Sequence, residues 1–286
     1  MNGKILITGA TGTIGKALVA QLRQTNADFL AAGRDATKTA AALNVRANQA
    51  VQFDFADPAT FAAATAGVDR AFLLGPPLFY DLDKLLGPFI DFLQAAGIRR
   101  VVYLSALNAE KMGADLSFHT NVENKLQQDG FELTILKPSF FAQNFKNYEW
   151  DNITRHNITY VPAGDGVVAF VDVHDIAAVA AKVLTEEGHG GKTYNITGPE
   201  ALSYADAAGL LSEVTGRSIA YPAPTPQQYT DTLKQAGAPD FIAPYMISVY
   251  GIIAKHQAGQ VSNDVEQVTG KKPAALKQVL EEDFNG

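Results

Sequence analysis

The first half of the chain alternates between short apolar runs and longer segments in which apolar residues recur at helical spacing. In the first longer segment, Ile14, Leu18 and Leu22 fall on one face of a helix. The short runs have the length of buried strands and cover residues 4–8, 29–32, 51–54, 71–74, 101–105 and 133–136. Strands that alternate with helices predict an α/β fold with a doubly wound parallel sheet.

The pattern changes after residue 138. Aromatic residues crowd into 140–150 and prolines interrupt the chain between 222 and 244, which indicates a smaller mixed C-terminal lobe. A helix expected over 175–184 and a strand expected over Thr193–Ile196 return the chain to the main sheet. We therefore expect residues 1–138 with about 168–198 to form one domain, and about 139–167 with 199–286 to form the lobe.

A glycine-spaced turn follows the first expected strand, where residues 8–15 read Thr-Gly-Ala-Thr-Gly-Thr-Ile-Gly. In a Rossmann-type site, Gly9 would allow the tight turn, Gly12 the approach of a pyrophosphate and Gly15 close packing of the helix on the sheet. The N-terminus of the following helix would supply unpaired N–H groups to the phosphates. Glycine spacing alone arises by chance in loops, but here strand, turn and amphipathic helix agree. The sequence therefore predicts a dinucleotide-binding domain.

The end of the second expected strand discriminates between the two nicotinamide cofactors. An acidic residue there binds the ribose 2′-hydroxyl of NAD, whereas an arginine accommodates the 2′-phosphate of NADP. Arg34 at this position and Lys38 one helical turn later favour NADPH over NADH. The neighbouring Asp35 leaves open that both cations are solvated residues opening a helix. Asp54 and Phe55 follow the third strand, where the adenine edge is expected, and the alternative for Asp54 is a turn or capping carboxylate.

Composition excludes several classes of function. The net charge of -7 and the pI near 5.2 argue against direct nucleic-acid binding. The absence of cysteine excludes disulfides and thiolate sites, and no zinc-binding His-Glu-x-x-His pattern occurs, so no metal is expected. The most apolar late stretch, 247–254, is too short to span a membrane. The first strand begins near residue 4, without room for a signal peptide, so we expect a cytoplasmic protein.

Four blocks of sequence carry a family resemblance that runs along almost the whole chain. Beside the glycine turn they are Leu-Lys-Pro-Ser-Phe-Phe-Ala-Gln-Asn at 136–144, Phe-Val-Asp-Val-His-Asp-Ile-Ala at 170–177 and Lys-Thr-Tyr-Asn-Ile-Thr-Gly-Pro-Glu at 192–200. In these blocks the chain resembles the NmrA-like atypical short-chain dehydrogenases. The resemblance implies NAD(P)H-dependent reduction of quinones, azo dyes or triphenylmethane dyes. Residues 73–77 and 99–106 are also similar to ergot-alkaloid iminium reductases. The family also contains regulators that bind the dinucleotide without turnover.

The site is expected beyond the carboxyl ends of the strands, with the first domain binding NADPH and the lobe binding the substrate. Expected cofactor contacts are Gly9, Thr11, Gly12, Thr13, Ile14, Gly15, Arg34, Lys38, Asp54, Phe55, Leu74, Gly75, Pro76, Ser105 and Pro138. Expected substrate contacts are Pro77, Ala106, His119, Phe140, Phe141, Asn144 and Trp150. The aromatic residues among them are suited to stacking on a flat substrate, with the alternative that half of the aromatic set is core.

The chain lacks the proton donor of the typical short-chain enzyme, a Tyr-x-x-x-Lys helix after the fifth strand. That segment reads Asp-Leu-Ser-Phe-His-Thr-Asn-Val-Glu from Asp115, and the only Tyr-x-x-x-Lys, at Tyr80, follows the fourth strand. His119, at the border of the helix's apolar stripe, is the candidate titrating residue. The alternative is that His119 is a hydrogen-bonded structural residue. Ser105 is a second catalytic candidate, which would bond the nicotinamide ribose or a substrate oxygen. The alternative is that Ser105 is a turn residue at the end of its strand.

The missing donor restricts the chemistry. Reduction of an unactivated ketone creates a strongly basic alkoxide and so needs a positioned acid. A reduced quinone is phenol-like, with a pKa of about 10, and a cationic dye or iminium needs no proton. We therefore expect an NADPH-dependent oxidoreductase acting on a small, electron-poor aromatic acceptor through proximity. The alternative is a non-catalytic NADP-binding sensor, and both a monomer and a homodimer remain open.

Overall fold

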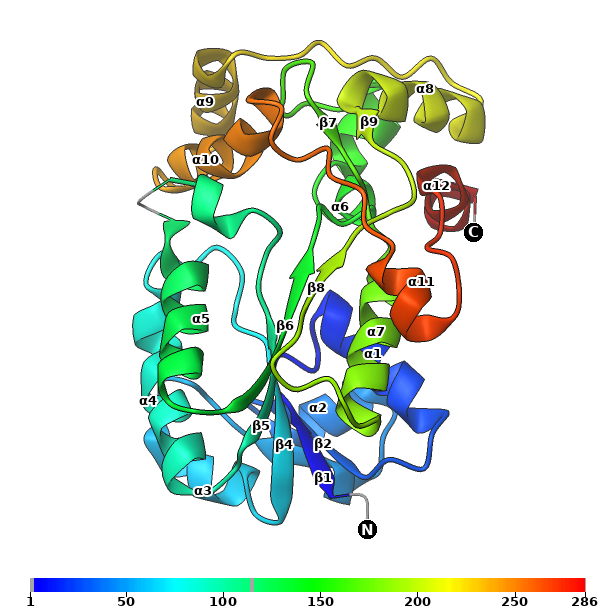
Figure 1. Cartoon of the computed structure of the whole chain (residues 1–286). Helices are drawn as coiled ribbons and strands as arrows, with labels where there is room; N and C mark the ends of the chain where they lie inside the picture. The colour runs from blue at the N-terminus through cyan, green and yellow to red at the C-terminus, as the bar shows by residue number, and fades with distance from the viewer. Residues whose placement is uncertain (1–2, 114–115, 286) are drawn as a thin grey trace. The chain divides into compact units, whose positions relative to one another are not determined.

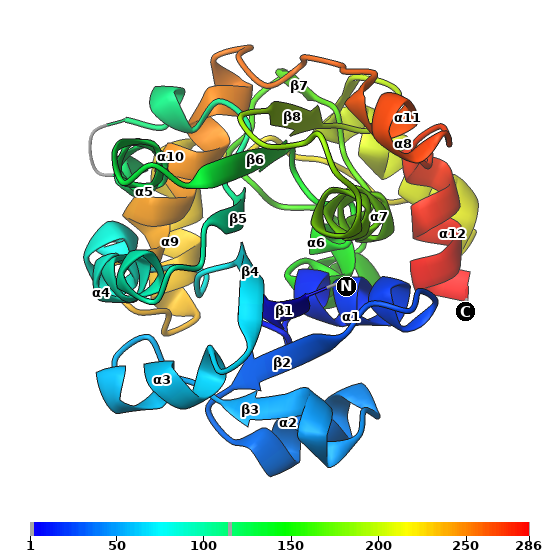
Figure 2. The ribbon, with the colours of Figure 1, turned by 60° about the horizontal axis from the view of Figure 1, so that its bottom comes forward.

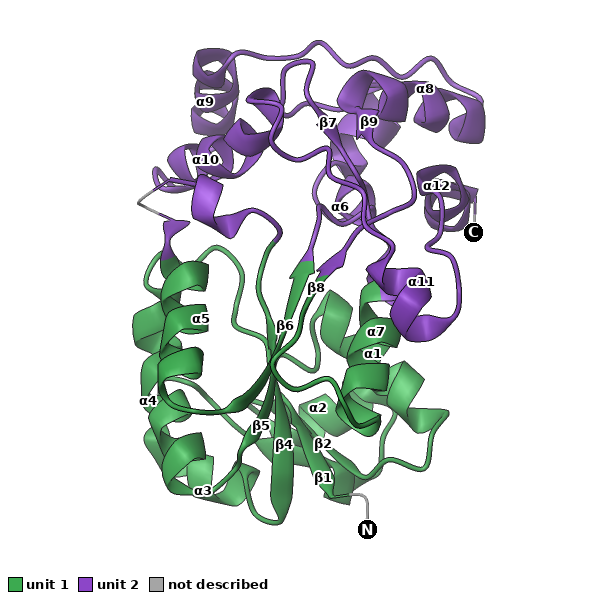
Figure 3. Cartoon of the chain, in the orientation of Figure 1, with its two compact units in different colours: residues 1–106, 118–137, 176–194 green, residues 107–117, 138–175, 195–286 purple. Residues whose placement is uncertain are grey.

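The structure is a computed structural model, and it describes residues 3–113 and 116–285. The chain divides into two compact units, coloured separately in Figure 3. Unit 1 comprises residues 1–106, 118–137 and 176–194, and unit 2 comprises residues 107–117, 138–175 and 195–286. The expected division placed 107–117, 138, 168–175 and 195–198 with the sheet, whereas the division into compact units assigns them to unit 2. The assignment of cofactor and substrate binding to these two parts stays a prediction.

The main sheet has the strand order β3-β2-β1-β4-β5-β6-β8. Its strands are β1 (Lys4–Ile7), β2 (Phe29–Gly33), β3 (Ala50–Gln52), β4 (Val68–Leu73), β5 (Arg100–Leu104), β6 (Glu132–Pro138) and β8 (Thr193–Ile196). Neighbours from β3 to β6 pair in parallel. β8 is also parallel, because the N–H groups of Ile135 and Ser139 donate to the carbonyls of Lys192 and Ile196 in the same direction. The predicted Rossmann-type α/β fold is confirmed.

Helices cover both faces of this sheet (Figures 1 and 2). On one face lie α1 (Thr13–Arg23), α2 (Ala36–Leu43) and α7 (Val173–Thr185), and on the other α3 (Phe61–Ala64), α4 (Leu82–Ala95) and α5 (Phe118–Gln128). Short 3-10 helices span Ala47–Gln49 and Pro58–Thr60. The predicted stripe of α1 is buried, with Leu18 and Leu22 at 0% exposure. The helix expected from Asp115 begins at Phe118, and Asp115 itself lies outside the described residues.

The observed limits of the strands differ from the predicted ones by up to three residues, and two of these differences have a clear physical cause. β4 begins at Val68 rather than 71, because the polar Asp69 and Arg70 interrupt the apolar run although they lie in the strand. The buried Arg70 guanidinium donates to the Leu184 carbonyl at 2.7 Å and pairs with Asp69 at 2.9 Å. β3 ends at Gln52, before Phe53, whose ring contacts the Phe89 ring edge-on at 4.7 Å. Neither the contacts of Arg70 nor the packing of Phe53 can be inferred from the pattern of apolar residues along the chain.

Unit 2 has the mixed character expected of the lobe. Its elements are a 3-10 helix (Ala109–Lys111), α6 (Asn144–Asn147), a π-helix (Asn152–His156), β7 (Val167–Val168), β9 (Leu202–Ser203), α8 (Tyr204–Thr215), α9 (Pro226–Gln235), α10 (Ile242–Ala254), α11 (Asp264–Thr269) and α12 (Leu276–Asn285). β7 and β9 pair antiparallel. α8 begins with a capping box, in which the side chains of Ser203 and Asp206 bond each other's backbone N–H.

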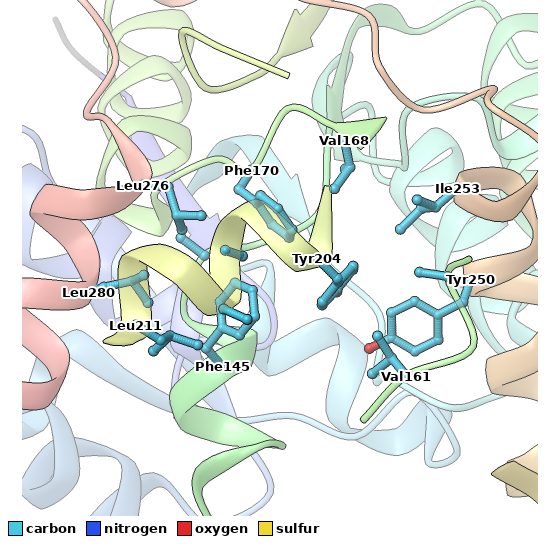
Figure 4. Packing of buried hydrophobic residues seen from close by; sticks show 14 of the residues in the cluster. Phe145, Val161, Val168, Phe170, Tyr204, Leu211, Tyr250, Ile253, Leu276 and Leu280 are labelled. Atoms are coloured by element: carbon cyan, nitrogen blue, oxygen red, sulfur yellow. The ribbon is translucent and has the colours of Figure 1, made fainter. Parts of the chain in front are cut away.

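The core of unit 2 is centred on three aromatic side chains (Figure 4). The ring of Phe145 lies 5.2 Å from that of Phe170 and 5.6 Å from that of Tyr204. α8 and α12 close the core with Leu211 and Leu280, both fully buried. Phe145 therefore belongs to the core, which is the alternative to substrate stacking that the sequence left open for half of the aromatic set.

Candidate functional site

The glycine turn leaves the start of α1 open. Gly9 has a φ of 62°, in the left-handed region, and its carbonyl accepts the Gly12 N–H at 3.0 Å. No side chain caps α1, and in the described part of the chain no protein group accepts the N–H groups of Thr13, Ile14 and Gly15. Gly9, Thr11, Gly12 and Thr13 are exposed, whereas the Ile14 side chain is buried, so Ile14 offers a ligand only its backbone. Such an open helix start fits a pyrophosphate.

Gly15 is required by the turn itself. A Cβ added at Gly15 would lie 2.2 Å from the carbonyl oxygen of Gly9 and 2.6 Å from Cα of Ala10. Close packing on the sheet was expected for this glycine, and the closest approach is instead to the backbone of the turn. A side chain at Gly15 would therefore open the turn.

Thr8 joins the glycine turn to the end of β4. Its fully buried hydroxyl accepts the Leu74 N–H at 2.8 Å and lies 3.1 and 3.0 Å from the carbonyl oxygens of Phe72 and Leu74. A Cβ on Gly9 would lie 3.0 Å from the Leu74 side chain. Leu74 and Gly9, both expected cofactor contacts, are thus neighbours, with Gly75 next in sequence and the exposed Pro76 and Pro77 after it. Site reasoning from sequence missed Thr8, although it stands beside Gly9.

The end of β2 presents an unpaired guanidinium. Arg34 is exposed and, within the described residues, forms no hydrogen bond or ion pair. Asp35 is occupied as the N-cap of α2, since its Oδ1 accepts the Lys38 N–H at 2.9 Å. The exposed Lys38 ammonium lies 3.9 Å from Asp35. Both cations are therefore available to an anionic ligand.

The end of β3 resembles a turn in its hydrogen bonding. Asp54 Oδ1 accepts the Ala56 N–H at 2.9 Å, which is the turn role given as the alternative for Asp54. The Phe55 ring contacts Phe53 edge-on at 4.8 Å. Both side chains are half-buried. Their contact with an adenine stays a prediction.

His119 on α5 is paired with a tyrosine that the site prediction missed. Its Nδ1 lies 2.7 Å from the hydroxyl of Tyr103, a fully buried residue of β5. Burial lowers the pKa of His119 to about 4, and the nearby Lys137 ammonium acts in the same direction. Burial raises the pKa of Tyr103 well above its usual value. At neutral pH both groups are therefore uncharged.

Ser105 belongs to a second polar group. Its hydroxyl donates to Oε1 of Glu123, one helical turn after His119 on α5, and Oε2 of Glu123 pairs with the Lys137 ammonium of β6 at 3.0 Å. Ser105 and Glu123 are buried. Glu123 and Lys137 were not among the expected site residues. The signals that could have found them are the helical i, i+4 spacing from His119 and the strand end at Pro138.

The remaining expected substrate residues differ in their surroundings. Pro77, Ala106 and His119 belong to unit 1, and Phe140, Phe141, Asn144 and Trp150 belong to unit 2. Phe140 stacks on Tyr250 with ring centroids 5.8 Å apart, and Phe141 forms a backbone bridge with Val171. Trp150 stacks on Phe284 at 5.3 Å and is 42% exposed. Asn144 begins α6, and Pro138 is buried and accepts the Leu107 N–H at 2.9 Å.

Over residues 3–113 and 116–285, no helix is long and apolar enough to cross a membrane. The same residues contain no group of three or more His, Cys, Asp or Glu side chains arranged to hold a metal ion.

The fold and the turn define the class of protein. A parallel doubly wound sheet whose first strand leads through a glycine turn into an uncapped helix is a dinucleotide-binding fold of Rossmann type. More narrowly, the chain belongs to the NmrA-like family, whose model matches residues 1–284.

Relatives and solved structures are similar over nearly the whole chain. An NAD(P)H azoreductase of Xenophilus azovorans is 34% identical over 272 residues, which cover 93% of each chain. An NADPH-dependent quinone oxidoreductase from Escherichia coli, complexed with NADPH, superposes with a TM-score of 0.89 at 26% identity, covering 98% of this chain and 100% of that one. A triphenylmethane reductase of Citrobacter sp., complexed with NADP(H), gives 0.85 at 25%, covering 98% and 99%. The chain is an enzyme of the NAD(P)H-dependent reductase class.

Proposed function

We propose that this protein transfers hydride from NADPH to a small, electron-poor aromatic acceptor, such as a quinone, a cationic dye or an iminium. The observation that carries the proposal is the chemistry at the end of β5. His119, with a pKa of about 4, and the buried Tyr103 are both neutral, and neither is a strong acid at physiological pH. Names of the similar azo, quinone and triphenylmethane reductases support the acceptor class.

The residues that would hold the cofactor lie at the carboxyl ends of β1, β2 and β4. The open N–H groups of α1 would bind the pyrophosphate, and Thr8 keeps Leu74 and Gly75 beside that turn. The unpaired Arg34, with Lys38 beyond it, would bind the 2′-phosphate and so select NADPH over NADH. When bound, the cofactor supplies the hydride.

The protein's own contribution is to hold the acceptor and to offer a hydrogen bond without giving up a proton. Tyr103 donates to Nδ1 of His119, because a buried hydroxyl needs an acceptor and this nitrogen lies 2.7 Å away. The proton of the neutral imidazole then lies on Nε2, which is a hydrogen-bond donor. Such a donor stabilises the phenol-like anion of a reduced quinone. It gives little help to an alkoxide, which needs full protonation.

The acceptor classes separate this proposal from the alternatives. We expect the protein to oxidise NADPH with a simple quinone and to decolourise a triphenylmethane cation, but not to reduce an unactivated aliphatic ketone. Steady-state NADPH oxidation, followed at the cofactor's absorbance, measures all three. Efficient ketone reduction would contradict the absence of a dedicated acid, and tight NADPH binding without turnover on any acceptor would instead support a sensor.

A further inference from the structure

The groups at the end of β5 form two parallel pairs between a strand and a helix. Tyr103 and Ser105 are two residues apart, so their side chains leave β5 and its extension on the same side. His119 and Glu123 are four residues apart on α5 and share one face. Tyr103 meets His119 at 2.7 Å, and Ser105 meets Glu123. Lys137 completes the second pair by binding the other carboxylate oxygen.

This arrangement sets the direction of the Ser105 hydrogen bond. An ionised carboxylate only accepts hydrogen bonds and an ammonium only donates them. The Lys137 ammonium, 3.0 Å from Oε2, balances the buried charge of Glu123. Glu123 therefore takes the single hydroxyl hydrogen of Ser105, and the lone pairs of Oγ remain for another donor. Ser105 cannot donate to a substrate oxygen while Glu123 holds its proton.

We propose that Glu123 and Lys137 are positioning residues that make Ser105 a hydrogen-bond acceptor for the nicotinamide riboside half of the cofactor. The group it receives is an N–H of the carboxamide or an O–H of the ribose. The proposal rests on the proposed function, because it presumes that a nicotinamide cofactor reaches the carboxyl end of β5. It differs from the alternative in which the Ser105 hydroxyl donates to a substrate oxygen.

The ion pair allows a test in which the hydrogen-bond direction is reversed and then restored. In Glu123→Gln, the Lys137 ammonium attracts the amide oxygen, so the amide NH₂ faces Ser105 and donates to Oγ. Ser105 then turns its hydrogen toward the ligand. In the double variant Glu123→Gln, Lys137→Met the amide is free to rotate, and its oxygen again accepts the Ser105 hydrogen. A second mutation should therefore recover what the first one lost.

The experiment measures the affinity for NADP⁺ by calorimetry, which requires no turnover. We expect Ser105→Ala to weaken binding about 5- to 10-fold, the value of one hydrogen bond. Where the group received is a carboxamide N–H, which only donates, Glu123→Gln should weaken binding by about 10-fold or more and the double variant should return to within about 3-fold of the wild type. A ribose hydroxyl can also accept, so its loss in Glu123→Gln should be smaller. Asp91→Asn, which removes the ion pair between Asp91 on α4 and Lys125 on α5, the helix that carries Glu123, is the matched control and should leave the NADP⁺ affinity unchanged.

The oxidised 3-acetylpyridine analogue of the cofactor, which lacks the carboxamide N–H groups, identifies the donor. If Ser105→Ala weakens NADP⁺ but not the analogue, the donor is the carboxamide, and if both weaken equally, it is the ribose hydroxyl. Unchanged NADP⁺ affinity in Ser105→Ala, or a double variant weaker than Glu123→Gln alone, would overturn the proposal. Failure of the wild type to bind NADP⁺ would instead overturn the proposed function. Thermal unfolding of each variant shows whether it is folded, and Ser105→Ala removes only one oxygen atom.

Discussion

The low pKa of His119 predicts a specific dependence of stability on pH. An unfolded histidine has a pKa near 6.5, whereas burial beside Tyr103 lowers that of His119 to about 4. Between these values the unfolded chain binds a proton that the native protein does not. The free energy of unfolding therefore rises with pH across this interval, and the contribution of His119 is lost as the pH falls from about 6.5 toward 4.

The size of the effect follows from the same two values. A tenfold change in proton affinity is worth about 1.4 kcal/mol, which sets a ceiling of about 3 kcal/mol. The ring of His119 is half-buried rather than enclosed, and partial solvent screening reduces the expected value to about 2 kcal/mol. His119→Gln removes the titrating group but keeps an oxygen to accept the Tyr103 hydroxyl.

Urea unfolding at a series of pH values tests this prediction. Between about pH 7 and 4.5 the wild type should lose about 2 kcal/mol more stability than His119→Gln. Its quinone reduction should also show no step near pH 6.5, because His119 stays neutral there. Equal pH dependence of stability in both proteins, or a histidine-like step in the rate that disappears in His119→Gln, would refute the assigned protonation state.

Three further predictions concern the cofactor and the two units. Arg34→Ala should weaken the binding of NADPH roughly 10- to 100-fold and leave the binding of NADH unchanged. Arg23→Ala, at the C-terminal end of α1, is the control and should affect the binding of neither cofactor. Equal losses for both cofactors in binding titrations would exclude Arg34 from the 2′-phosphate. Thr8→Val should cost about 1–3 kcal/mol in urea unfolding, because the Leu74 N–H loses its buried acceptor; an unchanged midpoint would show that the hydrogen bond is dispensable. Burial raises the pKa of Glu149 above that of an unfolded glutamate, so the contribution of Glu149 to the free energy of unfolding falls as the pH rises through the raised pKa. Glu149→Gln should therefore gain stability relative to the wild type as the pH rises above about 4.5, and the opposite slope in thermal unfolding would contradict the assignment.

The fold was predictable because the inner strands of its sheet are buried on both faces. β1, β2 and β5 are continuous apolar or nearly apolar runs, and their alternation with helices indicates a parallel sheet. The prediction made β4 too short at its start, because Arg70 is a charged residue inside the strand. The Arg70 guanidinium is satisfied by the carbonyl of Leu184, which is distant in the sequence. Periodicity cannot report a contact of that kind.

The site was predictable only in part, for a similar reason. Strand ends and glycine spacing identified Gly9, Arg34 and Ser105 as candidates, and the border of a helix's apolar stripe identified His119. What these residues can do depends on their partners, and neither the Tyr103 contact with His119 nor the Glu123 contact with Ser105 follows from spacing in one element. Both contacts require β5 to lie against α5, and that packing is a feature of the tertiary structure. The protonation state of His119 and the hydrogen-bond direction of Ser105 therefore had to come from the structure.

Direct transfer of hydride to carbon is the central claim, and isotope labelling tests it most directly. The protein is mixed with NADPH that carries deuterium at the nicotinamide C4 and with a triphenylmethane cation, and the colourless product is analysed by mass spectrometry and NMR. The account predicts one deuterium at the central carbon of the product, derived from one face of the nicotinamide. Absence of reduction, or a reduced product without deuterium at that carbon, would contradict it.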